Sequence, residues 1–129
     1  MDYLTIAMAK GRLGHEALQV FKSLGLTGAW EPDSRKLIFD DDENCLRYVY
    51  VKPADVVTYV ENGVADLGVV GRDSILEQEG DIYEIMDLNI GKCKFSVAGR
   101  ADRPEYKKDE ILKVATKYPH VAQKYFAGK

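Results

Sequence analysis

The feature that most constrains this chain is residues 4–14, where an apolar run meets a glycine turn and then a helical pattern. The run Leu4–Ala9 predicts a buried strand, and Lys10-Gly11-Arg12 predicts a turn. Apolar side chains then recur at helical spacing: Leu13, Ala17, Val20, Phe21 and Leu24. Such a corner directs backbone N–H groups, the positive end of a helix dipole and cationic side chains toward one place. It predicts either a phosphate site or, equally, a strand end that Lys10 and Arg12 merely solvate.

The composition is that of an ordinary globular chain. Of 129 residues, 46% are hydrophobic and 30% charged, and the formal net charge is -3. A slightly acidic chain without a basic stripe argues against a nucleic-acid partner. Met1-Asp2-Tyr3 lacks the basic start of a secretion signal, and no apolar run approaches membrane-spanning length, so we expect a cytoplasmic protein without a membrane partner. Cys45 and Cys93 lack zinc-like spacing and are expected to be reduced core thiols.

The rest of the chain predicts strands alternating with helices. Further strands are predicted at 35–39, 46–51, 65–70, 82–88, 92–98 and 111–115. Further helices are predicted from Pro53 to Gly63, from an N-cap-like Asp73 through Leu76, and over 120–127, with Gly25 ending the first helix. These elements predict a first α/β lobe over residues 1–100 with a central, largely parallel sheet flanked by helices. Residues 101–129 are then the incomplete start of a second α/β lobe.

Several residue types that could carry chemistry have a plainer explanation. The acidic run 40–44 lacks the glycine and the distant glutamate of a calcium loop, so it is interpreted as a solvated hairpin tip. His15 and His120 are interpreted as surface or capping residues rather than bases. The remaining signal is a set of cations beside turns: Lys10, Arg12, Arg35, Lys52, Arg72 and Lys117. A ligand with several phosphates would explain several of them together, whereas solvated strand ends would explain each separately.

Blocks of residues along nearly the whole chain resemble one enzyme family. They are Leu4-Thr5-Ile6-Ala7 with Lys10-Gly11-Arg12, Asp33-Ser34-Arg35-Lys36-Leu37-Ile38, Asp55 through Glu61, Gly63 through Gly68, Gly71-Arg72-Asp73, Tyr83-Glu84, Asp87-Leu88, and Ala115-Thr116-Lys117-Tyr118-Pro119. In this order they resemble ATP phosphoribosyltransferase, the first enzyme of histidine biosynthesis. The chain is most similar to the short form, which works with a regulatory partner resembling histidyl-tRNA synthetase.

The resemblance implies a two-domain fold like that of periplasmic binding proteins, with substrates in the cleft and an oligomeric assembly. A ring nitrogen of the adenine of ATP attacks the anomeric carbon of phosphoribosyl pyrophosphate and expels pyrophosphate, with Mg²⁺ carried mainly by the pyrophosphate oxygens. By resemblance, Arg12 and Arg35 are the catalytic residues that contact the departing pyrophosphate. The implied substrate-binding residues are Lys10, Gly11, Lys52, Gly71, Arg72, Asp73, Thr116, Lys117 and Tyr118.

The sequence departs from the family in one large respect. Family members carry a later acidic-glycine-threonine loop that grips the ribose 5-phosphate, and this chain has no equivalent. We therefore expect these 129 residues to be inactive alone. Two other roles stay open: a non-catalytic lobe that binds a nucleotide or another anion, and a structural lobe that assembles with a regulatory partner.

Overall fold

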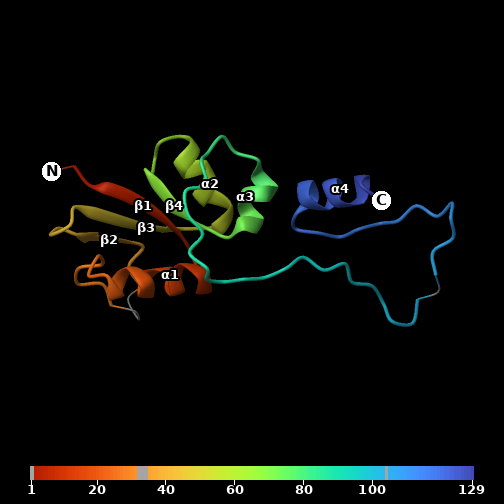
Figure 1. The fold of residues 1–129 in the computed structure, drawn as a ribbon, viewed down its shortest axis with the longest axis horizontal. Helices are drawn as coiled ribbons and strands as arrows, with labels where there is room; N and C mark the ends of the chain where they lie inside the picture. The colour runs from red at the N-terminus through yellow and green to blue at the C-terminus, as the bar shows by residue number, and fades with distance from the viewer. Residues whose placement is uncertain (1, 32–34, 104) are drawn as a thin grey trace.

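A computed structural model describes residues 2–31, 35–103 and 105–129. Pro32, Asp33, Ser34 and Pro104, which entered the turn, connection and family-block predictions, lie outside the described residues. In chain order the elements are β1 (Leu4–Ala9), α1 (Arg12–Ser23), β2 (Ile38–Asp41), β3 (Leu46–Val51), α2 (Pro53–Glu61), β4 (Leu67–Val69), α3 (Arg72–Gln78) and α4 (Pro119–Ala127). Figure 1 shows one sheet between helices, with α4 beside α3.

The sheet has the strand order β2-β3-β1-β4 and is largely parallel, as predicted. Strand β1 pairs in parallel with β3 on one side and with β4 on the other, whereas β2 pairs antiparallel with β3 as a hairpin. Helix α1 covers one face, α2 covers the opposite face, and α3 packs against α2 (Figure 1). The fold is therefore an α/β sheet wound in both directions from β1.

Strand β1 is the centre of the core because both of its faces are covered. Its alternation directs Ile6 and Met8 to the α1 face, and Ala7 and Ala9 to the α2 face. On the α1 face the buried partners are Ala17, Leu18, Trp30 and Tyr48. On the α2 face they are Val51, Val56 and Ala65. Burial on both faces explains why the sequence of this strand is a continuous apolar run.

The first two helices end where the glycines predicted. Helix α1 stops at Ser23, and Gly25 follows in the left-handed region with φ 74°. Helix α2 stops at Glu61, and Gly63 follows, also with φ 74°. A residue without Cβ takes this conformation at little cost, so glycine ends a helix cleanly. The C-terminal helix α4 begins at Pro119, one residue before the predicted start.

Three predicted strands are wrong. The described part of 82–118 contains no helix or strand. Tyr83, Ile85 and Ile111 are 95%, 74% and 86% exposed. Their apolar alternation is typical of strands, but a strand also needs a neighbour to pair its backbone, and in the described chain these segments have none. Other predicted strands are shorter than expected, since β2 begins at Ile38 rather than residue 35 and β4 spans only Leu67–Val69.

Two smaller expectations also need correction. Cys93 is exposed and Cys45 is half-buried, so neither is a core thiol. The acidic hairpin is not simply a solvated tip, because Asp41 is only 1% exposed. The backbone N–H and the side-chain amide of Asn44 donate to its carboxylate at 3.1 and 2.7 Å. These hydrogen bonds hold the pKa of Asp41 below its ordinary value.

Candidate functional site

The carboxyl ends of the parallel strands gather the cationic residues at one edge of the sheet. Ala9 at the end of β1 lies opposite Val51 at the end of β3, and Met8 lies opposite Val69 at the end of β4. The residues that follow, Lys10, Lys52 and Arg72, therefore emerge from the same edge. All three are exposed.

The connection that carries Arg35 reaches the same edge from the other direction. Because β2 runs antiparallel to β3, the residues before β2 lie beside the carboxyl end of β3. The backbone N–H of Tyr50 donates to the carbonyl of Leu37 at 2.8 Å and fixes this connection. The backbone of Arg35, two residues earlier, is thus at the edge where Lys52 emerges. The side chain of Arg35 is exposed.

The neighbouring strands β1 and β4 form the topological switch point of the sheet. The chain leaves β1 into α1 on one face and leaves β4 toward α3 on the other (Figure 1). In open α/β sheets, ligands bind outside the carboxyl ends of strands at such a point, because the two connections diverge there. The corners at the two strand ends, residues 10–12 and 71–73, therefore flank the position where this architecture places a ligand.

The start of α1 is open toward that position. Gly11 precedes the helix with φ 104° and ψ -157°, a conformation that favours glycine. Among the residues that the structure describes, no side chain caps α1, and the first turn of the helix contains no acidic residue. Gly14 lets this turn lie against the sheet, since a Cβ there would overlap the carbonyl oxygen of Ala9 and approach Cε1 of Tyr50 to 3.3 Å. The positive end of the α1 dipole is thus fixed at the switch point, close to Lys10 and Arg12.

The cations at this edge are weakly committed to partners within the protein. Nε of Arg12 lies 3.0 Å from Oε1 of Glu16, but the Arg12 side chain is 93% exposed. Nε of Arg72 lies 3.9 Å from Oε1 of Glu84, also at the surface. Exposed pairs of this kind contribute about 0–1 kcal/mol, so both guanidinium groups can exchange their partner for a ligand phosphate. Within the described residues, no hydrogen bond or ion pair is seen for the side chains of Lys10, Arg35, Lys52 and Lys117.

The structure joins two predicted site segments that lie far apart in sequence. The hydroxyl of Tyr118 donates to Oδ2 of Asp73 at 2.9 Å. This hydrogen bond to a carboxylate raises the pKa of Tyr118, because it favours the protonated phenol. The backbone N–H of Tyr118 donates to Oγ1 of Thr116 at 2.9 Å, which shapes the turn before α4. The pair 71–73 and 116–118 therefore forms one corner on the α3 side of the switch point.

One detail of this corner differs from the prediction. Asp73 is not the N-cap of α3, since the helix begins at Arg72 and Gly71 takes the capping position. Asp73 lies in the first turn, where its Oδ1 accepts the backbone N–H of Ser74 at 2.8 Å. A Cβ on Gly71 would overlap the same oxygen. A side chain at residue 71 would therefore displace the Asp73 carboxylate from its hydrogen bond to Ser74.

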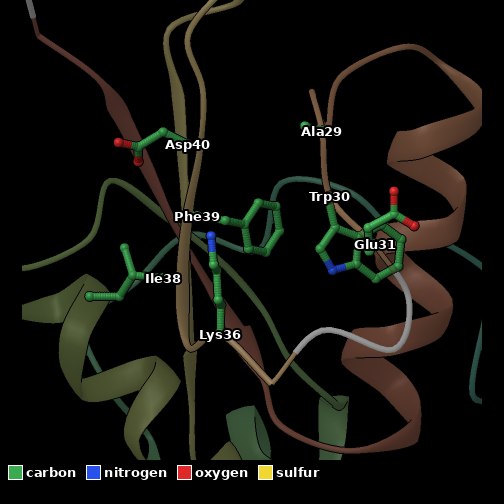
Figure 2. A pocket seen from close by; sticks show the side chains of 7 residues that line it. All are labelled: Ala29, Trp30, Glu31, Lys36, Ile38, Phe39 and Asp40. Atoms are coloured by element: carbon green, nitrogen blue, oxygen red, sulfur yellow. The ribbon is translucent and has the colours of Figure 1, made fainter.

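A hollow of about 490 Å³ lies elsewhere, between β2 and the segment after α1 (Figure 2). It is lined by Ala29, Trp30, Glu31, Lys36, Ile38, Phe39 and Asp40. The rings of Trp30 and Phe39 stack at a centroid distance of 6.1 Å. None of the predicted site residues lines this hollow, and no motif in the sequence predicted it. Lys10, Arg35, Lys52 and Arg72 emerge at the edge of the sheet and not at this pocket.

Comparison with known proteins decides the family. Residues 52–129 match the family model HisG, described as ATP phosphoribosyltransferase. The chain belongs to the ATP phosphoribosyltransferase family. Over its whole length it is 60% identical to an ATP phosphoribosyltransferase of Clostridioides difficile (strain 630), covering 62% of that relative. It is 49% identical to one of Lachnoclostridium phytofermentans, covering 61% of it.

A solved ATP phosphoribosyltransferase has the same fold. The ATP phosphoribosyl transferase (HisG:HisZ) complex from Thermotoga maritima contains a chain that matches with a TM-score of 0.65 and 25% identity. The match covers 97% of this chain and 58% of that one. The chain thus spans about three fifths of the length of the ATP phosphoribosyltransferases that it matches. No helix in the described residues is long and apolar enough to cross a membrane.

Proposed function

We propose that this chain contains the first lobe, and the start of the second, of an enzyme that transfers a phosphoribosyl group from phosphoribosyl pyrophosphate to the adenine ring of ATP, releasing pyrophosphate, in histidine biosynthesis. Family membership supports the reaction. The observation that carries the assignment to this lobe is the sheet edge where Lys10, Arg12, Arg35, Lys52 and Arg72 emerge beside the open start of α1. Polyphosphates are the ligands that such a gathering of cations and free N–H groups suits.

The chemistry needs alignment and charge neutralisation rather than a covalent intermediate. Negative charge grows on the pyrophosphate as the bond to the anomeric carbon breaks, so groups that bind the leaving pyrophosphate more tightly than the substrate lower the barrier. Arg12 and Arg35 are placed in this role, because a guanidinium can contact two phosphate oxygens at once. Lys10, Gly11 and Lys52 bind phosphates on the α1 side, and the corner of 71–73 with 116–118 lines the opposite side.

Magnesium enters this proposal with the substrate. Within the described residues, no group of His, Cys, Asp or Glu is placed to hold a metal ion. The edge offers cations, which suit phosphate oxygens and repel a bare divalent cation. Mg²⁺ is therefore proposed to ride on the pyrophosphate oxygens, where it adds to the neutralisation of the leaving group.

The cellular setting is part of the same proposal. The solved relative is a HisG:HisZ complex, which supports assembly with a regulatory subunit resembling histidyl-tRNA synthetase, in an oligomer. We place this assembly in the cytoplasm, where ATP and phosphoribosyl pyrophosphate are available.

The test is a pair of substitutions in a form that turns over. Arg12→Ala and Arg35→Ala should each lower kcat by about 10²-fold while the Kd for ATP changes only a few-fold, because the lost contact strengthens in the transition state. Arg100→Ala is the matched control, since Arg100 is exposed and, within the described residues, its side chain pairs only with Asp102. Unchanged turnover in both edge variants would remove the assignment. Calorimetry of these 129 residues with ATP is the companion measurement: binding without turnover would leave an anion-binding lobe.

A further inference from the structure

Helix α4 is held against α3 without a buried apolar face. None of its residues is buried. The chain between α3 and α4 runs away from the sheet and returns, so the covalent connection does not fix where α4 lies (Figure 1). Its position therefore depends on contacts with α3, together with the ring of Phe95, which lies 5.0 Å from that of Tyr118 just before the helix.

Glu77 of α3 makes the most complete of these contacts. Its Oε1 accepts the backbone N–H of His120 at 3.0 Å, and its Oε2 accepts the backbone N–H of Val121 at 3.0 Å. Nδ1 of His120 donates to the Glu77 carbonyl at 2.7 Å. Helix α4 has no side-chain cap of its own and no acidic residue in its first turn. Glu77 thus supplies from a neighbouring helix the acceptors and the negative charge that a helix start requires.

The contact bears directly on the corner at the switch point. Tyr118 immediately precedes α4, and its hydroxyl donates to Asp73 at 2.9 Å. Asp73 and Glu77 are one helical turn apart on α3, so both carboxylates lie on the same side of the helix. One carboxylate holds the residue before α4, and the other holds the first N–H groups inside it.

We propose that Glu77 is a positioning residue: by capping α4 from α3, it keeps Thr116–Tyr118 beside Gly71–Asp73 at the sheet edge. The role of Glu77 in substrate binding rests on the proposed function, whereas its role in keeping Tyr118 beside Asp73 does not. Glu77 itself points at backbone N–H groups and not at the edge, and its side chain is only 15% exposed. It acts through α4.

An ion pair between α4 and Glu79, the residue that follows α3, provides a matched control. Nζ of Lys124 lies 2.5 Å from Oε1 of Glu79, but these side chains are 72% and 48% exposed. A pair so open to water contributes little, and it joins α4 away from the turn that carries Tyr118. Glu79→Gln therefore removes the same type of charge beside the end of α3, while the hydrogen bonds from Glu77 to the backbone N–H groups at the start of α4 remain.

The experiment compares Glu77→Ala, Glu77→Gln and Glu79→Gln in the full 129-residue chain. Amide hydrogen exchange should become about five- to tenfold faster across α4 in Glu77→Ala, as expected for loss of a helix cap, and remain unchanged in β1. Glu77→Gln keeps one acceptor and should show part of the effect. If Glu77→Ala also loses protection in β1, the whole fold is destabilised, and the effect on α4 is then judged from Glu77→Gln.

A spectroscopic signature of Tyr118 separates positioning from simple capping. NMR of tyrosine-labelled protein, assigned with Tyr118→Phe, follows its titration, and the buried Tyr48 reports that the sheet stays folded. Release from Asp73 should lower the Tyr118 midpoint toward the ordinary value of 10.0 in the Glu77 variants, but not in Glu79→Gln. The Glu77 carboxylate also raises the pKa of Tyr118 directly, so the Glu77 variants are measured with and without Asp73→Asn. A fall that is as large in the Asp73→Asn background reports only the lost Glu77 charge and overturns the proposal. An unchanged midpoint in both Glu77 variants overturns the proposal, even if α4 exchanges faster, and so does an equal shift in Glu79→Gln.

Calorimetry with ATP then tests the link to function. The Kd for ATP should rise about tenfold in Glu77→Ala, as expected when a charge-assisted contact that orders the site is lost. A shifted Tyr118 with an unchanged Kd overturns the role in substrate positioning. If the unaltered chain binds no ATP, the proposed function fails, while the exchange and Tyr118 measurements still decide whether Glu77 holds the corner.

Discussion

Substituting Gly14 tests whether the close approach of α1 to β1 shapes the site. At an open helix position, alanine in place of glycine stabilises by about 0.5–1 kcal/mol. Here the new Cβ would overlap the carbonyl oxygen of Ala9 and press on the Tyr50 ring. The Ala9 carbonyl oxygen is a backbone atom of the central strand β1, so it cannot rotate away from the new Cβ. Overpacking a core costs about 1–3 kcal/mol, and backbone overlap belongs at the upper end. We expect Gly14→Ala to lower the free energy of unfolding by about 2 kcal/mol net.

Urea unfolding followed by Trp30 fluorescence measures this change. Trp30 is 6% exposed, and its ring lies 5.8 Å from that of His15 on α1, so its emission reports on this face of the sheet. With an m-value of about 2 kcal/mol/M, the midpoint should fall by about 1 M. Gly63→Ala is the control, because its Cβ meets open space and adds only the strain of φ 74°, about 1 kcal/mol. A Gly14→Ala midpoint equal to or above that of the unaltered protein would refute the reasoning.

Three further substitutions test the core by thermal or urea unfolding. Tyr48→Phe removes the hydroxyl that donates to the Leu26 carbonyl at 2.7 Å and should destabilise by about 1 kcal/mol. Because burial raises the pKa of Tyr48 to about 12, the protonated phenol contributes to the free energy of unfolding below pH 10.0, and this contribution is lost as pH rises toward 12. Tyr48→Phe should remove this loss of stability at alkaline pH. Asp41, whose pKa Asn44 lowers, contributes stability above pH 3.8 that is lost as pH falls through its folded value. Asp41→Asn should therefore be less stable at neutral pH and less sensitive to acid. Gly68→Ala should destabilise by about 1–3 kcal/mol, since its Cβ would approach α2 side chains to 2.7 Å; no loss would show that α2 can shift.

Periodicity and glycine placement predicted the first half of the fold well, because there the local pattern and the tertiary environment agree. Leu4–Ala9 is apolar throughout and is buried on both faces, and Gly25 and Gly63 end helices in the left-handed conformation. The parallel order of the strands also follows from alternation, since helices must connect them. The gathering of Lys10, Lys52 and Arg72 at one edge was predictable for the same reason.

The later segments could not be predicted because their state depends on partners that the pattern does not reveal. Residues 82–88 alternate like a strand, but Tyr83 and Ile85 are exposed for lack of a neighbour. Glu77 escaped notice for a related reason. A glutamate inside a helix is ordinarily a solvated residue, and only the docking of α4 turns its carboxylate toward the N–H groups of His120 and Val121. No spacing within the sequence signals a cap that comes from another helix.

Because α4 is held by charged contacts and β1 by apolar packing, we expect sulfate to change the stability of the two ends of this chain in opposite directions. Sulfate strengthens the burial of apolar side chains around β1, because it is excluded from their surface. The same ions screen the Lys124–Glu79 pair and weaken the attraction between the Glu77 carboxylate and the start of α4. Added sulfate should thus weaken the attachment of the C-terminal helix while it stabilises the sheet, without any substitution.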